Sequence, residues 1–308
     1  MALALPPFIF GGAPIGGLFA PVSEEDAAAT LAAAWEAGVR GFDTAPHYGV
    51  GLSERRIGDF LTGRPRQEFI VSTKVGRVLE PASEDVQGAE EFYETPPMRR
   101  VRDYTRDGVR RCLEDSLRRL RLDRVDIALI HDPDDYMDEA VSSAYPALAE
   151  LRDEGVVGAI GAGMNSASAL ASLVERAELD CVLVAGRYTL LDQSAASDLL
   201  PLCAERGIAV LAGGVFNSGI LADPSAKDAR YDYAPATQEV RDRARHVRSV
   251  CEKYGVPVAA AALHFTLRHP AVTSVVVGAR TPSEIAADVS YLGLDIPDDL
   301  FSDLVSFR

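Results

Sequence analysis

The stretch GVRGFDTAPHYGVGLSE, residues 38–54, indicates how the rest of the chain is organised. Its first part predicts a helix end and a short buried strand, so Asp43 falls where a strand ends. Tyr48 follows in a loop punctuated by glycine and proline, a common place for functional residues. Ser53 is expected to cap a new helix. A carboxylate at a strand end and a phenol a few residues later can meet in one cleft, so we expect half of a proton-transfer site here.

Strand-like and helix-like segments alternate along the whole chain. The expected strands are short apolar runs without polar alternation, as parallel strands buried on both faces require. They lie at residues 8–10, 39–44, 69–74, 125–130, 156–162, 181–185, 208–212 and 272–277. Because helices separate them and no linker divides the chain, we predict an α/β fold with a single (β/α)8 TIM barrel over residues 1–308. A doubly wound open sheet is the alternative.

Helices are expected between these strands and at the end of the chain. They lie at residues 24–37, 54–61, 107–120, 140–154, 166–177, 194–206, 238–254, 258–268 and 282–291. Residues 76–102 are rich in glutamate and proline and show no period, so we expect an irregular lid or binding loop that sets specificity. Residues 223–235 are expected to form a polar loop that carries tyrosines.

The composition is that of an ordinary soluble protein, since 47% of the 308 residues are hydrophobic and 25% are charged. A net charge of −15 disfavours nucleic acid or an anionic membrane as a partner, because both favour a basic surface. The four cysteines form no C-x-x-C pair, which favours free thiols in a reducing cytoplasm. No apolar run approaches the roughly 20 residues of a membrane span, and residues 1–10 are expected to be a first strand rather than a signal peptide. We expect a cytoplasmic protein with a small-molecule substrate, and the oligomeric state stays open.

Polar side chains follow successive expected strands. Asp43 and Tyr48 come after the second strand, Lys74 ends the third, His131 ends the fourth, and Asn165 follows the fifth. In a barrel these strand ends converge on one mouth, where active sites are built. Each residue alone has an ordinary structural explanation, such as a cap or a core imidazole. Together they predict a site.

The chemistry of this set points to proton transfer. A free phenol has a pKa of about 10, and an ammonium beside Tyr48 is expected to lower the pKa of this phenol. Asp43 would keep Lys74 charged and oriented, and His131 would hydrogen-bond the reacting oxygen. This combination predicts carbonyl/alcohol redox chemistry with a bound hydride carrier. A metal site built from His131 and the acids at 132–135 is the alternative, which we do not expect because Lys74 would oppose a cation.

Five motifs resemble the aldo-keto reductase superfamily over essentially the whole chain. They are GFDTA with Tyr48-Gly49 and Ser53-Glu54, STK ending at Lys74, Asp126-Ile127 with His131, residues 158–165, and residues 276–288. The resemblance implies a (β/α)8 barrel that binds a nicotinamide dinucleotide without a Rossmann motif. It also implies that Tyr48 is the acid/base, that Lys74 and Asp43 tune it, and that His131 orients the substrate.

Further motifs are similar to one branch of that superfamily, which holds L-fucose (D-threo-aldose) 1-dehydrogenases and pyridoxal 4-dehydrogenase. They lie at residues 11–18, 104–107, 131–134, 186–193 and 214–219. The resemblance implies oxidation of a sugar lactol to its lactone with NAD. The alternatives are pyridoxal or another cyclic hemiacetal as substrate, a general NADPH-dependent aldehyde or ketone reductase, and a binding module without catalysis.

The resemblance also implies a set of cofactor contacts. They are Asn165, Gly214, Phe216, Asn217, Ser218, Gly278, Ala279, Arg280, Thr281, Glu284 and Asp288. The chain departs from the family where Ser-Asn usually clamps the nicotinamide amide, because Gly163-Met164 align there and Asn165 comes one position late. The usual glutamine and stacking tyrosine fall near Ala185 and Gly213, and Phe216 or Tyr188 is expected to compensate.

The last cofactor segment bears on the choice between NAD and NADP. Gly278 and Glu284 align where NADPH-using relatives carry basic residues for the 2′-phosphate. A carboxylate repels a phosphate and can accept a hydrogen bond from a ribose hydroxyl, so we expect NAD. NADP stays possible if Glu284 is only an acid in the first turn of a helix and Arg280 holds the phosphate.

Overall fold

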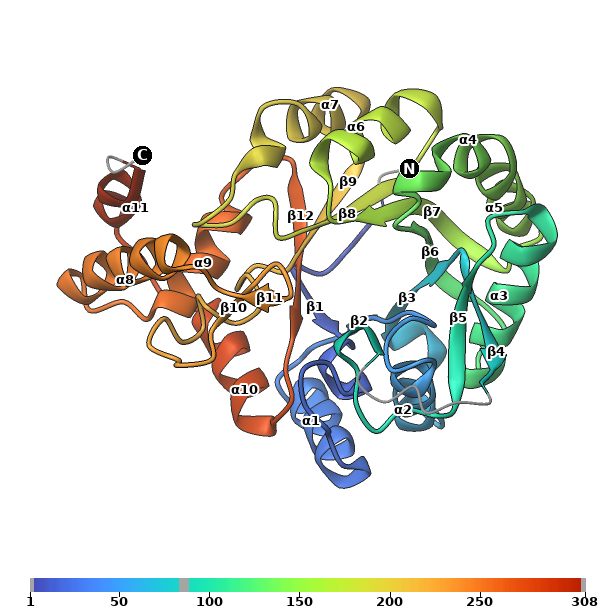
Figure 1. Ribbon diagram of the computed structural model, residues 1–308, viewed down its shortest axis with the longest axis horizontal. Helices are drawn as coiled ribbons and strands as arrows, with labels where there is room; N and C mark the ends of the chain where they lie inside the picture. The colour runs from blue at the N-terminus through green and yellow to red at the C-terminus, as the bar shows by residue number, and fades with distance from the viewer. Residues whose placement is uncertain (1–2, 83–88, 306–308) are drawn as a thin grey trace.

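The computed structural model describes residues 3–82 and 89–305, and it confirms the predicted barrel. Parallel strands close in the order β1-β12-β9-β8-β7-β6-β3-β2, with β1 paired to both β2 and β12 (Figure 1). Their bounds are β1 (Phe8–Gly11), β2 (Gly41–Asp43), β3 (Ile70–Val75), β6 (Val125–His131), β7 (Val157–Met164), β8 (Cys181–Ala185), β9 (Ala209–Gly213) and β12 (Val272–Gly278). The open sheet is therefore excluded.

Helices surround these strands. They are α1 (Glu24–Glu36), α2 (Leu52–Leu61), α3 (Arg106–Leu120), α4 (Met137–Glu139), α5 (Tyr145–Asp153), α6 (Ala167–Arg176), α7 (Leu199–Arg206), α8 (Gln238–Lys253), α9 (Val258–Leu267), α10 (Pro282–Tyr291) and α11 (Asp298–Val305). In α3, the Thr105 hydroxyl accepts a hydrogen bond from Gly108 N and caps the helix start. Val109, Leu113 and Leu120 are buried on one face, because apolar residues recur at helical spacing.

The barrel encloses its own apolar cluster, separate from the layer between strands and helices. Ile9, Ile127, Leu129 and Leu211 lie in this inner cluster, and each is almost fully buried. A filled interior makes the barrel a packed core rather than a channel. The polar strand ends are therefore available only at the mouth.

The expectation of an irregular loop over residues 76–102 is wrong for the part that the structure describes. The strands β4 (Arg77–Pro81) and β5 (Met98–Arg102) pair antiparallel in this segment. Their sequences are rich in arginine, glutamate and proline and lack a continuous apolar face, so the pattern gave no strand signal. Residues 83–88 lie outside the described residues.

The structure also corrects the start of α2. Gly51 occupies the N-cap position with φ +90°, so the helix begins at Leu52 and Ser53 already lies inside it. Ser53 is buried, and its Oγ accepts a hydrogen bond from the Thr44 hydroxyl at 2.9 Å. This serine therefore links the helix to the end of β2 instead of capping the helix.

Three further segments differ from the expectation. Helix α11 was not predicted; Leu300 and Phe301 pack into a cluster with α8, beside which α11 lies in Figure 1. The expected helix over residues 140–154 starts with a π-helical segment, Ala140–Ala144, before α5. The polar loop over residues 223–235 contains a small hairpin, β10 (Arg230–Tyr231) and β11 (Ala234–Pro235). Of the helices in the described ranges, none combines the length and apolarity needed to cross a membrane.

We predict that Gly58→Ala destabilises the protein, although alanine is normally the better helix former. A Cβ at Gly58 would lie 2.5 Å from the Leu120 carbonyl oxygen, and this backbone atom cannot swing aside. Helices α2 and α3 would have to separate, at a cost of about 1–3 kcal/mol. Denaturant unfolding measures this loss. Ser249→Ala on the exposed side of α8 is the control and should change stability by less than about 0.5 kcal/mol; an unchanged or higher stability of Gly58→Ala would contradict the packing argument.

Candidate active site

The Lys74 ammonium lies at the centre of the mouth. Its Nζ donates hydrogen bonds to Asp43 Oδ2 at 2.8 Å, to the Thr44 carbonyl at 3.0 Å and to Tyr48 Oη at 3.0 Å. Its three N–H donors are therefore matched by three acceptors. The side chain is only 1% exposed, so the charge depends on these partners rather than on water. The expected contact between the ammonium and the phenol is present.

Asp43 is fixed at the end of β2 by several contacts. Its Oδ1 accepts a short hydrogen bond from the Ser72 hydroxyl, and Ser72 is its register partner on β3. Its backbone carbonyl accepts a hydrogen bond from Gly12 N at 2.7 Å. Both carboxylate oxygens are thus occupied, one by Ser72 and the other by Lys74.

Burial dominates the acid/base behaviour of Tyr48. It raises the pKa of the phenol well above its usual value, and the charges of Asp43 and Asp132 raise it further. Arg77 acts in the opposite direction and is outweighed. The expectation that the pKa of Tyr48 is lowered is therefore wrong for this structure. The phenol is protonated at neutral pH.

His131 ends β6 and completes the predicted set. Its ring lies edge-on to Tyr48, with 6.1 Å between the ring centroids. Burial lowers the pKa of His131 well below its usual value, and Arg77 and Lys74 lower it further, so the imidazole is neutral. Its Nδ1 is buried and has no hydrogen-bond partner among the described residues. A neutral ring can hydrogen-bond a reacting oxygen without adding charge.

One cavity of about 740 Å³ extends from Asp43 and Tyr48 toward the start of α10, and neither Lys74 nor His131 is among the residues that line it. It is lined by Asp43 and Tyr48 at one end and by Arg280, Glu284 and Asp288 at the other. Of the other residues expected to hold the cofactor, Asn165, Gly214, Phe216, Asn217, Ser218 and Gly278 line it too. Ala279 and Thr281 do not line it: Ala279 is buried, and Thr281 caps α10.

The cavity wall fits an elongated, hydrogen-bonding molecule such as a dinucleotide. Gly11, Gly186, Gly213, Gly214, Gly219 and Gly278 line it, so much of the wall is backbone. Asn217 is 3% exposed, and its Oδ1 accepts no hydrogen bond from the described residues, so a buried acceptor is available in the wall. The volume lies within the usual range of small-molecule sites.

The far end of the cavity holds two carboxyl groups. Glu284 Oε2 accepts a hydrogen bond from Arg280 N at 2.7 Å, and Glu284 N donates one to Thr281 Oγ1 at 3.2 Å. Glu284 thus acts as a first-turn helix acid and also lines the cavity. Asp288 lies one turn later and is 8% exposed; burial and the charge of Glu284 raise its pKa to about 7.

The structure shows which aromatic residue is placed to replace the family residues that usually hold the nicotinamide ring. Phe216 lines the cavity, as expected of a compensating aromatic. Tyr188 does not, because its ring packs against Phe265 and His269 with centroids 5.2 Å and 5.1 Å away. Of the two aromatic residues expected to compensate, only Phe216 is therefore in the cavity wall. Asn165 is exposed at the end of β7 and lines the cavity.

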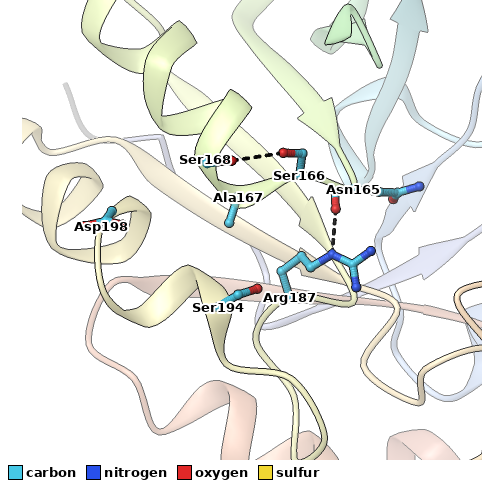
Figure 2. A pocket seen from close by; sticks show the side chains of 7 residues that line it. All are labelled: Asn165, Ser166, Ala167, Ser168, Arg187, Ser194 and Asp198. Carbon is cyan, nitrogen blue, oxygen red and sulfur yellow. Dashed lines mark hydrogen bonds between the residues drawn. The ribbon is translucent and has the colours of Figure 1, made fainter.

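Arg187 is a residue that the sequence did not single out. Its Nε donates to the Asn165 carbonyl at 2.6 Å, beside a second cavity of about 260 Å³ (Figure 2). Its terminal nitrogens bond Asp192 at 3.2 Å and both oxygens of Asp232 at 2.8 Å and 2.7 Å. One side chain therefore connects the end of β7 with the β10–β11 hairpin. No short-range sequence signal marks a pair 45 residues apart.

The β10–β11 hairpin places Tyr233 in the cavity wall, which Tyr48 also lines. The Tyr233 ring lies 6.1 Å from that of Phe19. On the other side of the hairpin, Arg230 pairs with Glu91 at 3.2 Å. Ion pairs thus hold the hairpin from two sides.

The alternative of a metal centre gains no support within residues 3–82 and 89–305. No three His, Cys, Asp or Glu side chains gather there in a way that could hold an ion. Arg77 NH2 instead occupies the position next to Asp132 Oδ2, at 2.7 Å. A guanidinium already neutralises the carboxylate that a cation would need.

Known proteins resemble this chain over nearly its whole length. The Aldo/keto reductase family matches residues 7–308. A D-threo-aldose 1-dehydrogenase of a Pseudomonas species is 45% identical, over 99% of this chain and 95% of its own length. A pyridoxal 4-dehydrogenase of Microbacterium luteolum is 40% identical, over 96% of this chain and 92% of its own length.

Solved structures agree with these sequence matches. The glycerol dehydrogenase AKR11B4 of Gluconobacter oxydans has a TM-score of 0.81 at 25% identity and covers 99% of this chain and 92% of its own. The holo form of aldo-keto reductase AKR11C1 of Bacillus halodurans has a TM-score of 0.78 at 24% identity, with the same coverage, and shares the fold. Aldo-keto reductases are oxidoreductases that use nicotinamide cofactors. The resemblance seen in the motifs is confirmed, and the chain belongs to the aldo/keto reductase family.

Proposed function

We propose that this protein oxidises the cyclic hemiacetal of a sugar of the L-fucose or D-threo-aldose type to its lactone, with NAD as hydride acceptor. The observation that carries the proposal is the 3.0 Å hydrogen bond between Lys74 Nζ and Tyr48 Oη at one end of the long cavity. The relative named D-threo-aldose 1-dehydrogenase, 45% identical, supports the choice of substrate.

In this proposal the chain moves one proton. The anomeric hydroxyl loses its proton to Tyr48 Oη while the anomeric carbon loses its hydrogen with both electrons, which leaves a carbonyl. The nicotinamide, when bound, supplies the acceptor for that hydride. Lys74 stabilises the phenolate that must be present before proton transfer, and Asp43 keeps the ammonium charged and aimed. His131 holds the reacting oxygen.

Pyridoxal in its hemiacetal form is the second candidate substrate. The relative named pyridoxal 4-dehydrogenase is 40% identical to this chain and supports it. The same site would act, because a cyclic hemiacetal and a lactol present the same reacting group. A panel of L-fucose, D-arabinose, L-galactose and pyridoxal, followed by NADH formation, separates the two.

The remaining alternatives receive less support. A binding module has no need for a lysine, an aspartate and a phenol held in mutual hydrogen bonds. A general NADPH-dependent reductase would meet two carboxyl groups, Glu284 and Asp288, at the cavity end away from Tyr48. The four free and buried cysteines are compatible with the cytoplasmic location that we propose.

We predict that Tyr48→Phe lowers kcat for lactol oxidation by a factor of about 10²–10⁴, with little change in KM. The pKa of the wild-type phenol is raised, and only the phenolate accepts a proton. The wild-type rate should therefore rise about tenfold per pH unit between roughly pH 7 and 9, whereas the residual rate of the variant should not. Steady-state kinetics across this range measures both. Tyr145→Phe on α5 is the control and should behave as wild type; full activity of Tyr48→Phe would falsify the assigned role.

We predict that kcat/KM with NAD exceeds kcat/KM with NADP by about tenfold or more, because Glu284 and Asp288 repel a 2′-phosphate. The pKa of Asp288 is about 7, so its carboxyl group is ionised above that pH and neutral below it. Asp288→Asn should therefore reduce the ratio of kcat/KM with NAD to kcat/KM with NADP most at about pH 8.5 and least at about pH 6. Asp295→Asn, an exposed position outside the cavity lining, should leave it unchanged. An equal or higher kcat/KM with NADP for the wild type would overturn the assignment of NAD.

A further inference from the structure

Asp132 occupies an unusual backbone conformation directly after His131, at the end of β6. Its φ is +43°, in the left-handed region that residues with a side chain rarely adopt. Asp132 N donates a hydrogen bond to the Gly163 carbonyl at 3.0 Å. Tyr104 Oη lies 2.6 Å from the His131 carbonyl and 3.0 Å from the Asp132 carbonyl, so its one proton holds this peptide segment. Backbone strain of this kind gathers at functional sites, where the surroundings enforce it.

This conformation places the Asp132 carboxylate beside the catalytic imidazole. Oδ2 lies 3.4 Å from His131 Nε2 and accepts a hydrogen bond from Arg77 NH2 at 2.7 Å. The carboxylate also contributes to the electrostatic environment of Tyr48 and Tyr233. It therefore lies in the same polar group as the residues assigned to proton transfer.

Arg77 is itself immobilised, so it fixes the carboxylate. Its side chain is 9% exposed, and NH1 lies 3.0 Å from Glu90 Oε2 and 3.2 Å from His47 Nδ1. Burial raises the pKa of Asp132 above its usual value, and the charge of the Arg77 guanidinium partly offsets this effect. A negative charge is thus held in a set position next to the imidazole.

One oxygen of this carboxylate remains available. The described residues bond only Oδ2, and the side chain is 20% exposed, so Oδ1 can accept a hydrogen bond from a ligand. The neighbouring polar groups cannot replace it as an anionic acceptor: His131 and His47 are neutral because burial lowers their pKa values, and the Arg77 guanidinium only donates hydrogen bonds. Asp132 is therefore the acceptor best suited to a hydroxyl group of the substrate.

We propose that Asp132 is a specificity-determining residue that accepts a hydrogen bond from the hydroxyl group on the carbon next to the reacting carbon. This assignment rests on the proposed oxidation of a hemiacetal. It narrows the substrate class to polyhydroxylated hemiacetals with a free hydroxyl at that carbon. Arg77 acts through Asp132 and is a positioning residue.

The test compares a sugar with its 2-deoxy analogue, for example L-fucose and 2-deoxy-L-fucose, with NAD. The wild type should favour the parent sugar by about 10–100-fold in kcat/KM, because a buried charged acceptor left without its partner is costly. Asp132→Gly tolerates the positive φ and removes the carboxylate, so the preference should fall to within about threefold of unity while turnover of the deoxy sugar persists. Asp132→Asn should give an intermediate preference, because a neutral amide makes a weaker hydrogen bond.

Asp135→Gly provides the matched control, since Asp135 lies three residues on, is 83% exposed and pairs with Arg102 at 3.5 Å. This variant should keep the wild-type preference for the parent sugar over the deoxy sugar. If both Asp132 variants keep the wild-type preference for the parent sugar over the deoxy sugar, whatever their thermal stability, the role assigned to Asp132 is overturned. The proposed function is not affected by that result. Failure of the wild type to oxidise either sugar overturns the proposed function and this assignment with it.

Discussion

The ion pair between Lys74 and Asp43 is the constraint on which the site depends. The two side chains are 1% and 2% exposed, so neither charge is stabilised by water. Removing one partner of such a buried pair typically costs about 3–5 kcal/mol, because the other charge is left uncompensated. The pair joins the neighbouring strands β2 and β3, whose register sets Asp43 opposite Ser72. The pairing of β2 with β3 therefore closes the barrel and also brings Asp43 and Lys74 together.

That ion pair does not by itself lower the pKa of the phenol. Lys74 donates a hydrogen bond to Tyr48, yet desolvation and two nearby carboxylates outweigh any benefit to the phenolate. His131 is neutral for a related reason, since burial and cations disfavour its charged form. The site at rest thus holds a neutral phenol and a neutral imidazole around one compensated charge pair.

The sequence predicted the barrel and the grouping of Asp43, Lys74 and His131 for the same reason. Parallel strands buried on both faces appear as apolar runs, and their carboxyl ends converge, so Asp43, Lys74 and His131 could be placed together from spacing alone. The β4–β5 hairpin was missed because its strands are rich in charged residues, and the bond between Arg187 and Asp232 was missed because it spans 45 residues. The misassigned cap at Ser53 has a local cause: Gly51 adopts a left-handed conformation and starts the helix earlier.

Two parts of the site near Tyr48 differ in how firmly they are held. Around Lys74 the partners are buried and every ammonium donor is used, so local opening there requires breaking the core. The β10–β11 hairpin is held by ion pairs that water reaches: Asp232 is 44% exposed and Glu91 38% exposed. Such pairs contribute roughly 0–1 kcal/mol each. Arg187 also donates a hydrogen bond to the carbonyl of Asn165. The hairpin can therefore detach before the barrel opens, while this arginine stays bound to the end of β7.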